Sequence, residues 1–243
     1  MRLLYDHGYL DRPLAQLEHF TAGSRMMVYG MGSRRMEARR GTSPRSLKRP
    51  FIQHTLAVAE ILVRLESACK GDLTVEFVGM EEALEQIKTD GTSGRKLNWN
   101  VSTLFKGTET NLGVVPDHLF GLRPRTANGA AVFYFLEVDR GTMPVMRSNL
   151  HMSSVYRKLL AYHETWRQGL HISLFDLKRL QVLMVTNGED RLRHLIAATK
   201  TLANGRGSRI FLFADMQYIK STSNIFAVPL TNGCEELSHL KDA

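Results

Sequence analysis

The sequence predicts an α/β fold in which helices flank a mixed sheet, preceded by a small basic unit. Short apolar runs typical of buried strands alternate with amphipathic helical segments between residues 50 and 220. Ten Lys and Arg residues fall within the first 50 positions, against four acidic ones. The composition, 43% hydrophobic and 23% charged, is that of a globular protein.

The N-terminal segment 1–38 has the pattern of a partial winged helix. Residues 2–9 predict a short helix, and weakly alternating segments at 16–20 and 26–31 predict a hairpin. A helix followed by a basic hairpin is the second half of a winged-helix DNA-binding unit. The two helices that would precede it are not in this pattern, so we expect only part of the unit. Residues 39–49 are predicted to form a basic linker that contains Gly, Ser and Pro.

The predicted core, residues 50–220, has the order helix, three strands, helix, strand, helix, strand. A short charged helical piece and a Gly/Ser-rich loop interrupt the three strands, and the last 23 residues, 221–243, are expected to be an irregular tail. The predicted helices are 50–69, 81–88, 153–168 and 190–203, and the predicted strands are 73–78, 114–122, 130–138, 179–186 and 210–214.

Several classes of protein are excluded. No apolar run approaches the roughly 18 residues of a membrane span, and the N-terminus lacks a signal-peptide core. The two cysteines, Cys69 and Cys234, form neither a disulfide framework nor a zinc motif. No phosphate-binding GxxxxGK[ST] motif is present. We therefore expect a cytoplasmic protein with no membrane partner.

The basic N-terminal block indicates a nucleic-acid partner, because clustered positive charge attracts the phosphate backbone. A solvated basic face without a partner is the alternative interpretation. The side chains that we expect to bind double-stranded DNA are Arg2, Arg12, Arg25, Arg34, Arg35, Arg39 and Arg40.

Three acidic residues are candidates for a metal site. Asp117 begins one predicted strand, and Glu137 and Asp139 end the next, two residues apart on one face. If the two strands pair as a hairpin, the three carboxylates converge and offer the oxygen ligands that Mg²⁺ or Mn²⁺ prefers. Lys158, on the following helix, supplies a cation for a phosphate. Two alternatives remain open: acids in solvated turns, or a register shifted by one residue that buries both later acids.

The segments that carry these residues resemble the replication-relaxation family of plasmids and other mobile elements. The resemblance lies in Pro116-Asp117, in the block FLEVDRGT at 135–142 and in Lys158 with Tyr162, and it extends over roughly residues 3–215. It implies a winged helix and a core similar to that of MOB-C-type relaxases, related to restriction endonucleases of the PD-(D/E)xK fold. It also implies a bacterial host.

The resemblance implies roles for individual residues. Asp117 becomes the first metal-binding acid and Glu137 the second. Asp139 stands where the nuclease pattern has lysine, so Lys158 is expected to supply that lysine from the helix. We assign Asp117, Glu137, Asp139 and Lys158 as catalytic, with the three acids as ligands of Mg²⁺ or Mn²⁺.

Four further residues are expected to be accessory. His54 falls at a His position of the family on the core helix, although a lone His there is also typical of packing. Arg140 and Thr142 contact phosphate or cap the turn. Tyr162 acts as a nucleophile in a relaxase-like reaction or is simply packed.

The sequence thus predicts a DNA-binding protein of plasmid or mobile-element replication or mobilisation, with a metal-dependent nicking core. The alternative is a non-catalytic DNA-binding regulator of replication or topology on a degenerate nuclease scaffold. In either case other replication or mobilisation proteins are expected partners.

Overall fold

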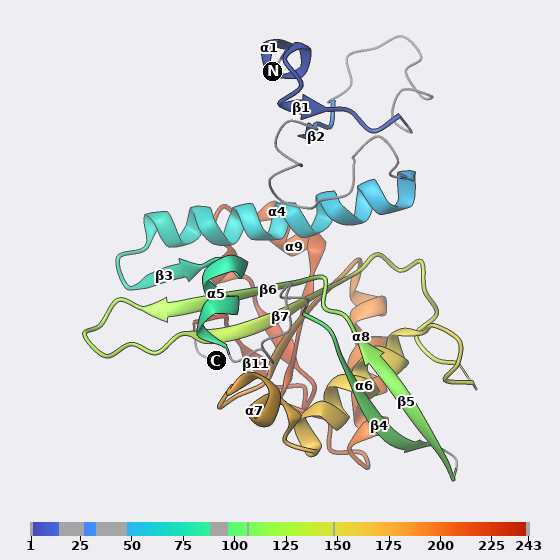
Figure 1. The fold of residues 1–243 in the computed structure, drawn as a ribbon. Helices are drawn as coiled ribbons and strands as arrows, with labels where there is room; N and C mark the ends of the chain where they lie inside the picture. The colour runs from blue at the N-terminus through green and yellow to red at the C-terminus, as the bar shows by residue number, and fades with distance from the viewer. Residues whose placement is uncertain are drawn as a thin grey trace. The chain divides into compact units, whose positions relative to one another are not determined.

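A computed structural model gives the fold as two compact units, residues 1–59 and 60–243 (Figure 1). The helix α4 (Arg49–Gly71) contains the boundary between them. The structure describes residues 2–14, 27–32, 48–87, 97–105, 107–147 and 149–241.

The first unit has the helix α1 (Arg2–Asp6) and two short strands, β1 (Leu10–Asp11) and β2 (Gly30–Met31). The strands pair antiparallel, with Leu10 opposite Met31. The helix lies within the predicted segment 2–9, and β2 lies within the predicted strand 26–31. β1 was not predicted, and the predicted strand 16–20 lies outside the described residues.

The second unit is built on a seven-stranded mixed sheet with the order β11-β10-β9-β8-β7-β6-β3. The three central strands β7, β8 and β9 are parallel to one another, and the outer strands pair antiparallel. The strands are β3 (Val75–Val78), β6 (His118–Pro124), β7 (Val132–Asp139), β8 (Gln181–Thr186), β9 (Phe211–Asp215), β10 (Leu230–Asn232) and β11 (Leu237–Ser238).

Helices connect the parallel strands, as crossover connections require. The predicted mixed α/β class is therefore confirmed, and the predicted helices are found within a few residues of their expected bounds. Besides α4, the predicted helices are α5 (Met80–Gln86), α6 (Val155–Arg167) and α8 (Glu189–Leu202). Two short helices that were not predicted are α7 (Leu170–Phe175) and α9 (Met216–Ser221).

The core beneath α6 is built around aromatic side chains of β7 and its neighbours. Phe135 of β7 lies within 6.0 Å, ring centre to ring centre, of Tyr162 of α6. Trp99 contacts both rings as well as Phe175, and its indole nitrogen donates a 2.8 Å hydrogen bond to the Thr165 hydroxyl. Because such rings bury large apolar areas, this cluster fixes α6 against the sheet.

The sequence analysis missed a β-hairpin that carries Trp99. Strands β4 (Trp99–Phe105) and β5 (Thr108–Val114) form a separate two-stranded sheet that contacts α6. The predicted strand 114–122 is accordingly divided: β5 ends at Val114 and β6 begins at His118. The break contains Pro116, which has no N–H to donate to a ladder.

The expectation of an irregular tail at 221–243 is wrong for the described part of that segment. Strands β10 and β11 extend the sheet beyond β9. The chain then returns to the sheet, where the carbonyl oxygen of buried Leu240 accepts a 2.8 Å hydrogen bond from the Tyr134 hydroxyl. Leu230 and Leu240 are buried, so the tail completes the core.

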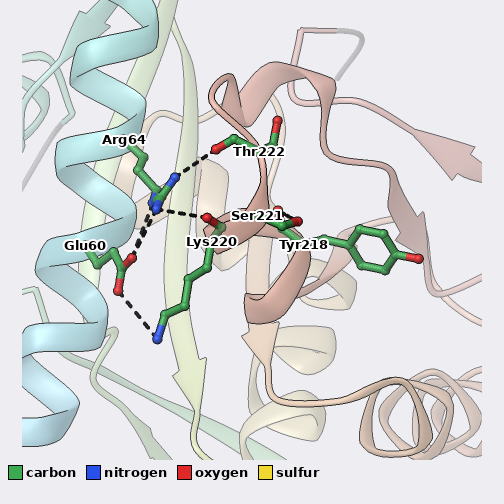
Figure 2. Close-up of polar contacts among 6 residues, drawn as sticks. All are labelled: Glu60, Arg64, Tyr218, Lys220, Ser221 and Thr222. Atoms are coloured by element: carbon green, nitrogen blue, oxygen red, sulfur yellow. Dashed lines mark hydrogen bonds and ion pairs between the residues drawn. The ribbon is translucent and has the colours of Figure 1, made fainter.

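Arg64 of α4 ties its helix to the end of α9 (Figure 2). Its guanidinium donates to the carbonyl oxygens of Thr222, at 2.9 Å, and Lys220, at 3.3 Å. Glu60, one turn earlier, pairs with both Arg64 and Lys220. Since the last carbonyls of a helix have no partner within it, this cation both satisfies them and complements the helix dipole.

No helix in the described part of the chain is long and apolar enough to cross a membrane.

Candidate active site

Asp117 is placed by the pairing of β6 with β7. These strands are antiparallel, with His118 opposite Leu136. Asp117 therefore lies beside the end of β7, where its N–H donates to the Leu136 carbonyl at 3.1 Å and its carboxylate accepts from the Val138 N–H at 2.8 Å. The backbone thus fixes this carboxylate next to Glu137, as the predicted hairpin requires.

Glu137 lies on the face of β7 that packs under α6, and only 2% of it is exposed. One carboxylate oxygen accepts a 2.8 Å hydrogen bond from the Tyr162 hydroxyl, and the other is paired with the Lys158 ammonium. Both partners come from α6, one turn apart. The Lys158 ammonium also lies 4.0 Å from Asp117 Oδ1, so the lysine stands between the two acids.

The environment of this group shifts the pKa of Glu137 and that of Lys158 upward. Burial, and to a smaller extent the charge of Asp117, raise the pKa of Glu137 from 4.5 to about 7 against the opposing charge of Lys158. Burial lowers the pKa of Lys158, but the charges of Glu137 and Asp117 outweigh it, so the net shift is upward and the lysine stays charged. The Lys158 side chain is 37% exposed and that of Asp117 15%, so both are reached by solvent.

Tyr162 is fully buried, and burial holds its pKa well above the usual value. A nucleophile must reach the phosphorus atom, and it attacks as the deprotonated phenolate. This hydroxyl instead remains protonated and donates to Glu137. Of the two interpretations from the sequence, the geometry favours packing and positioning over attack.

Asp139 is on the same face as Glu137 but is paired elsewhere. Arg191 of α8 binds its carboxylate with two nitrogens, at 2.7 and 3.2 Å, and the Thr186 hydroxyl donates at 3.0 Å. The Gly141 N–H caps the same carboxylate at 3.1 Å. Asp139 therefore closes the turn after β7 and neutralises Arg191, and the expected convergence of three carboxylates reduces to two.

The structure places the remaining predicted residues that it describes on other elements. Arg140 is half-buried and Thr142 is exposed on the loop after β7. His54 belongs to the part of α4 in the first unit. Arg12 stacks on Tyr5, with its guanidinium carbon 3.9 Å from the ring centre.

Among the other arginines expected to bind DNA, Arg2 begins α1. The rest lie outside the described residues, and their assignment stays a prediction: Arg25, Arg34, Arg35, Arg39 and Arg40.

Two carboxylates of this site are candidate ligands of a divalent metal ion. Within the described ranges, no three His, Cys, Asp or Glu side chains are grouped so that they could hold a metal ion. Two carboxylates, Asp117 and Glu137, do share one cation. Mg²⁺ is commonly bound by one or two carboxylates, with water and substrate phosphate completing its ligands. The pair fits that mode, and it does not fit an all-protein cage.

Sequence reasoning missed Arg191. The available signal was an arginine in the first turns of a helix that follows a core strand, since crossover helices from neighbouring parallel strands start at the same edge of the sheet. That edge also holds the ends of β7 and β8, where Asp139 is opposite Thr186. Only the packing of α8 identifies the partner.

The fold and site define a mixed α/β domain with a buried carboxylate–lysine pair at the edge of its sheet. The chain belongs to the replication-relaxation family, whose model it matches over residues 1–174. The match ends before β8, so Lys158 and both site acids lie within it, whereas Arg191 does not. Searches of curated proteins and of solved structures returned no significant match.

Proposed function

We propose that this protein acts in plasmid or mobile-element replication or mobilisation, and that its second unit is a metal-dependent DNA-nicking core of the restriction-endonuclease type. The observation that carries the proposal is the position of Lys158. It stands between Asp117 and Glu137, although it comes from a helix and not from β7. Asp139 occupies the position where the nuclease pattern has its lysine, and it is paired with Arg191. The role of that lysine is therefore assigned to Lys158.

The chain's own groups have distinct tasks in this proposal. Asp117 is fixed by the backbone of β7 and open to solvent, so it presents an oxygen to an incoming ligand. Glu137 is oriented by Tyr162. The exposed ammonium of Lys158 is placed to offset charge on a phosphate once the substrate draws it from Glu137. Such preorganised charges stabilise the transition state of phosphoryl transfer.

Asp117 and Glu137 would hold the divalent ion, which when bound supplies a Lewis acid and an activated water. In hydrolysis the water oxygen bonds to phosphorus, one P–O ester bond breaks, and the water's proton passes through solvent to the departing sugar oxygen. Lys158 remains charged throughout. Lys158 would orient the phosphate directly, and the two acids would act on it only through the ion that they would hold.

DNA docking is assigned to the basic first unit, proposed to be a partial winged helix. Its charge would give affinity that is strongly salt-dependent and carries little sequence choice. Net charge of +8 for the whole chain supports a polyanionic partner. Other proteins of replication or mobilisation are proposed as further partners.

A non-catalytic DNA-binding regulator is the second candidate, and one observation favours it. Both oxygens of Glu137 already have donors, Lys158 and Tyr162, so the group is satisfied without a metal. In that case the acids stabilise the scaffold, and control of replication or topology follows from binding alone.

The test is a nicking assay on supercoiled plasmid with Mg²⁺ or Mn²⁺, alongside gel-shift binding at low and high salt. We compare the wild type with Glu137→Gln, which keeps the shape of the side chain, and with Glu189→Gln, a matched control at an exposed acid of α8. Circular dichroism confirms that each variant is folded.

The nicking proposal predicts open-circle product from the wild type and the control, and loss of at least about a hundredfold with Glu137→Gln, the effect typical of a general catalytic group. DNA binding should persist in all three. Binding without nicking by any of them establishes the regulator instead. Absence of salt-sensitive binding contradicts both candidates.

A further inference from the structure

Glu137 lies near the end of β7, whereas a pocket lies at the start of the parallel strands β8 and β9. Its volume is about 510 Å³. It is lined by Gln181, the first residue of β8, and by Ile210, just before β9. Gln181 lies opposite Tyr134 of β7 and Met184 lies opposite Glu137, so three residues, or about 10 Å of strand at roughly 3.3 Å per residue, separate the two sites. The volume suits a small ligand, since such pockets typically measure about 300–1,000 Å³.

The lining of this pocket is positively charged. Among the described residues that line it, four have cationic side chains and none is Asp or Glu. One of the four, Arg209, is neutralised by two hydrogen bonds to Glu236, at 2.9 and 2.6 Å. In the described part of the chain the other three, Lys178, Arg179 and Arg206, make no ion pair. Three uncompensated cations around one cavity favour an anionic ligand.

The same pocket has an aromatic and imidazole wall. Trp166 is 46% exposed, and its ring centre lies 5.8 Å from that of His163. His163 and His171, 8% and 5% exposed, line the pocket, and the Nδ1 atom of each is buried without a partner among the described residues. The side-chain oxygen of Gln181 is likewise buried and has no hydrogen-bond partner among the described residues. These three atoms have almost no solvent-accessible surface, so they lie behind the pocket surface, and the ring that a ligand can reach is that of Trp166.

A close backbone contact fixes the wall formed by the loop between α8 and β9. Gly207 has φ +76°, and a Cβ added there would lie 1.9 Å from the carbonyl oxygen of Gly233. Only glycine fits both conditions. The loop is therefore seated on the turn after β10, which keeps Arg206 at the mouth of the pocket.

We propose that this pocket binds a phosphorylated nucleotide, with its phosphate on Arg179 and Arg206 and its base against Trp166. Guanidinium groups bind phosphate through paired, charge-assisted hydrogen bonds. An exposed indole is a platform on which any base stacks. A simple inorganic anion would leave the aromatic wall and most of the volume unused. The nucleotide is either free or part of a DNA strand, and the inference does not depend on cleavage at Glu137.

Tryptophan fluorescence provides the measurement. The chain has two tryptophans, and Trp166 is at the pocket whereas Trp99 is buried in the core. The wild type is titrated with deoxyadenosine, with deoxyadenosine 5′-monophosphate and with a short single-stranded oligonucleotide. The double variant Arg179→Ala/Arg206→Ala is then compared with a control that removes two cations outside the pocket.

The control double variant is Lys70→Ala/Arg193→Ala, whose side chains are 75% and 65% exposed on α4 and α8. We expect quenching by the monophosphate or the oligonucleotide, weakened roughly tenfold for each arginine removed from the pocket and unchanged in the control. Quenching by the monophosphate identifies a free nucleotide as sufficient; quenching by the oligonucleotide alone identifies a DNA strand.

Three results would overturn the inference. They are deoxyadenosine binding as tightly as its monophosphate, equal weakening in the pocket and control variants, and no quenching by any of the three probes. None of them bears on nicking, which is measured separately with Glu137→Gln. Failure of the nucleotide pocket and failure of the proposed activity are therefore distinguishable.

Discussion

Replacing Lys158 by methionine tests the electrostatics of the candidate site. The change keeps most of the side-chain stem and removes the ammonium, which leaves Glu137 buried and without its cation. In the wild type the pKa of Glu137 is about 7. Buried carboxyl groups without a charged partner reach about 8–9, so we expect a further rise of 1–2 units, or about 1.5–3 kcal/mol of the charged form's stability.

The sign of the pH dependence follows from these values. Between pH 4.5 and about 7 the folded wild type holds a proton on Glu137 that the unfolded chain has lost, so stability falls as the pH rises through this window. In Lys158→Met the loss continues to higher pH. The variant should therefore be about 1.5 kcal/mol more destabilised at pH 8.5 than at pH 5, where Glu137 is protonated in both proteins.

Urea unfolding followed by tryptophan fluorescence measures this difference, because both tryptophans lie in the second unit. The matched control is Lys200→Met. Its side chain is also 37% exposed, but its partner Glu235 is 60% exposed, so its cost should be small at both pH values. A destabilisation by Lys158→Met that is the same at pH 5 and pH 8.5 would refute the assignment of a buried, coupled pair.

Three further variants probe neighbouring contacts. Tyr162→Phe leaves one oxygen of Glu137 unpaired and should cost about 1–2 kcal/mol in thermal unfolding; plasmid nicking should persist, whereas its complete loss would favour a tyrosine nucleophile. Arg191→Ala leaves the half-buried Asp139 without its cation, and we expect a loss of about 2–3 kcal/mol in urea unfolding; a loss under 0.5 kcal/mol, the usual range for a surface change, would argue against the pair. Arg64→Ala should cost about 1–2 kcal/mol and raise amide exchange at the end of α9; unchanged exchange there would contradict its capping role.

The candidate site was largely predictable from the sequence because its residues are tied to local patterns. Asp117 lies just before β6, and Glu137 lies near the end of β7. These strands are consecutive in the chain and pair as a hairpin, so the closeness of the two acids could be predicted. Lys158 was predicted from its place on the next helix. Asp139 was expected to join the metal ligands, but in the structure it pairs with Arg191. Two residues on one face of a strand need not share a partner. Arg191 comes from α8, far along the chain, and no local pattern specified the contact.

The fold was likewise predicted where the local pattern is strong and missed where it is weak. Apolar periodicity predicted α6, β7, β8 and β9, because buried helices and central strands have the strongest patterns. The β4–β5 hairpin was missed, since its alternation includes many polar residues and its stability comes from Trp99 packing on α6. The tail was misjudged for a related reason: its two strands are three and two residues long, too short to show a period.

The sequence alone predicted the fold class, the basic character of the first 50 residues and the family resemblance, and it named Asp117, Glu137, Asp139 and Lys158 as candidate site residues. These are properties of composition and of residues near one another along the chain. Only the tertiary structure decided that Lys158 stands between Asp117 and Glu137, that Asp139 is held by Arg191, and that three cations surround a pocket at the start of β8 and β9. Those facts depend on distances across packed elements, which burial and side-chain packing set and which no local pattern encodes.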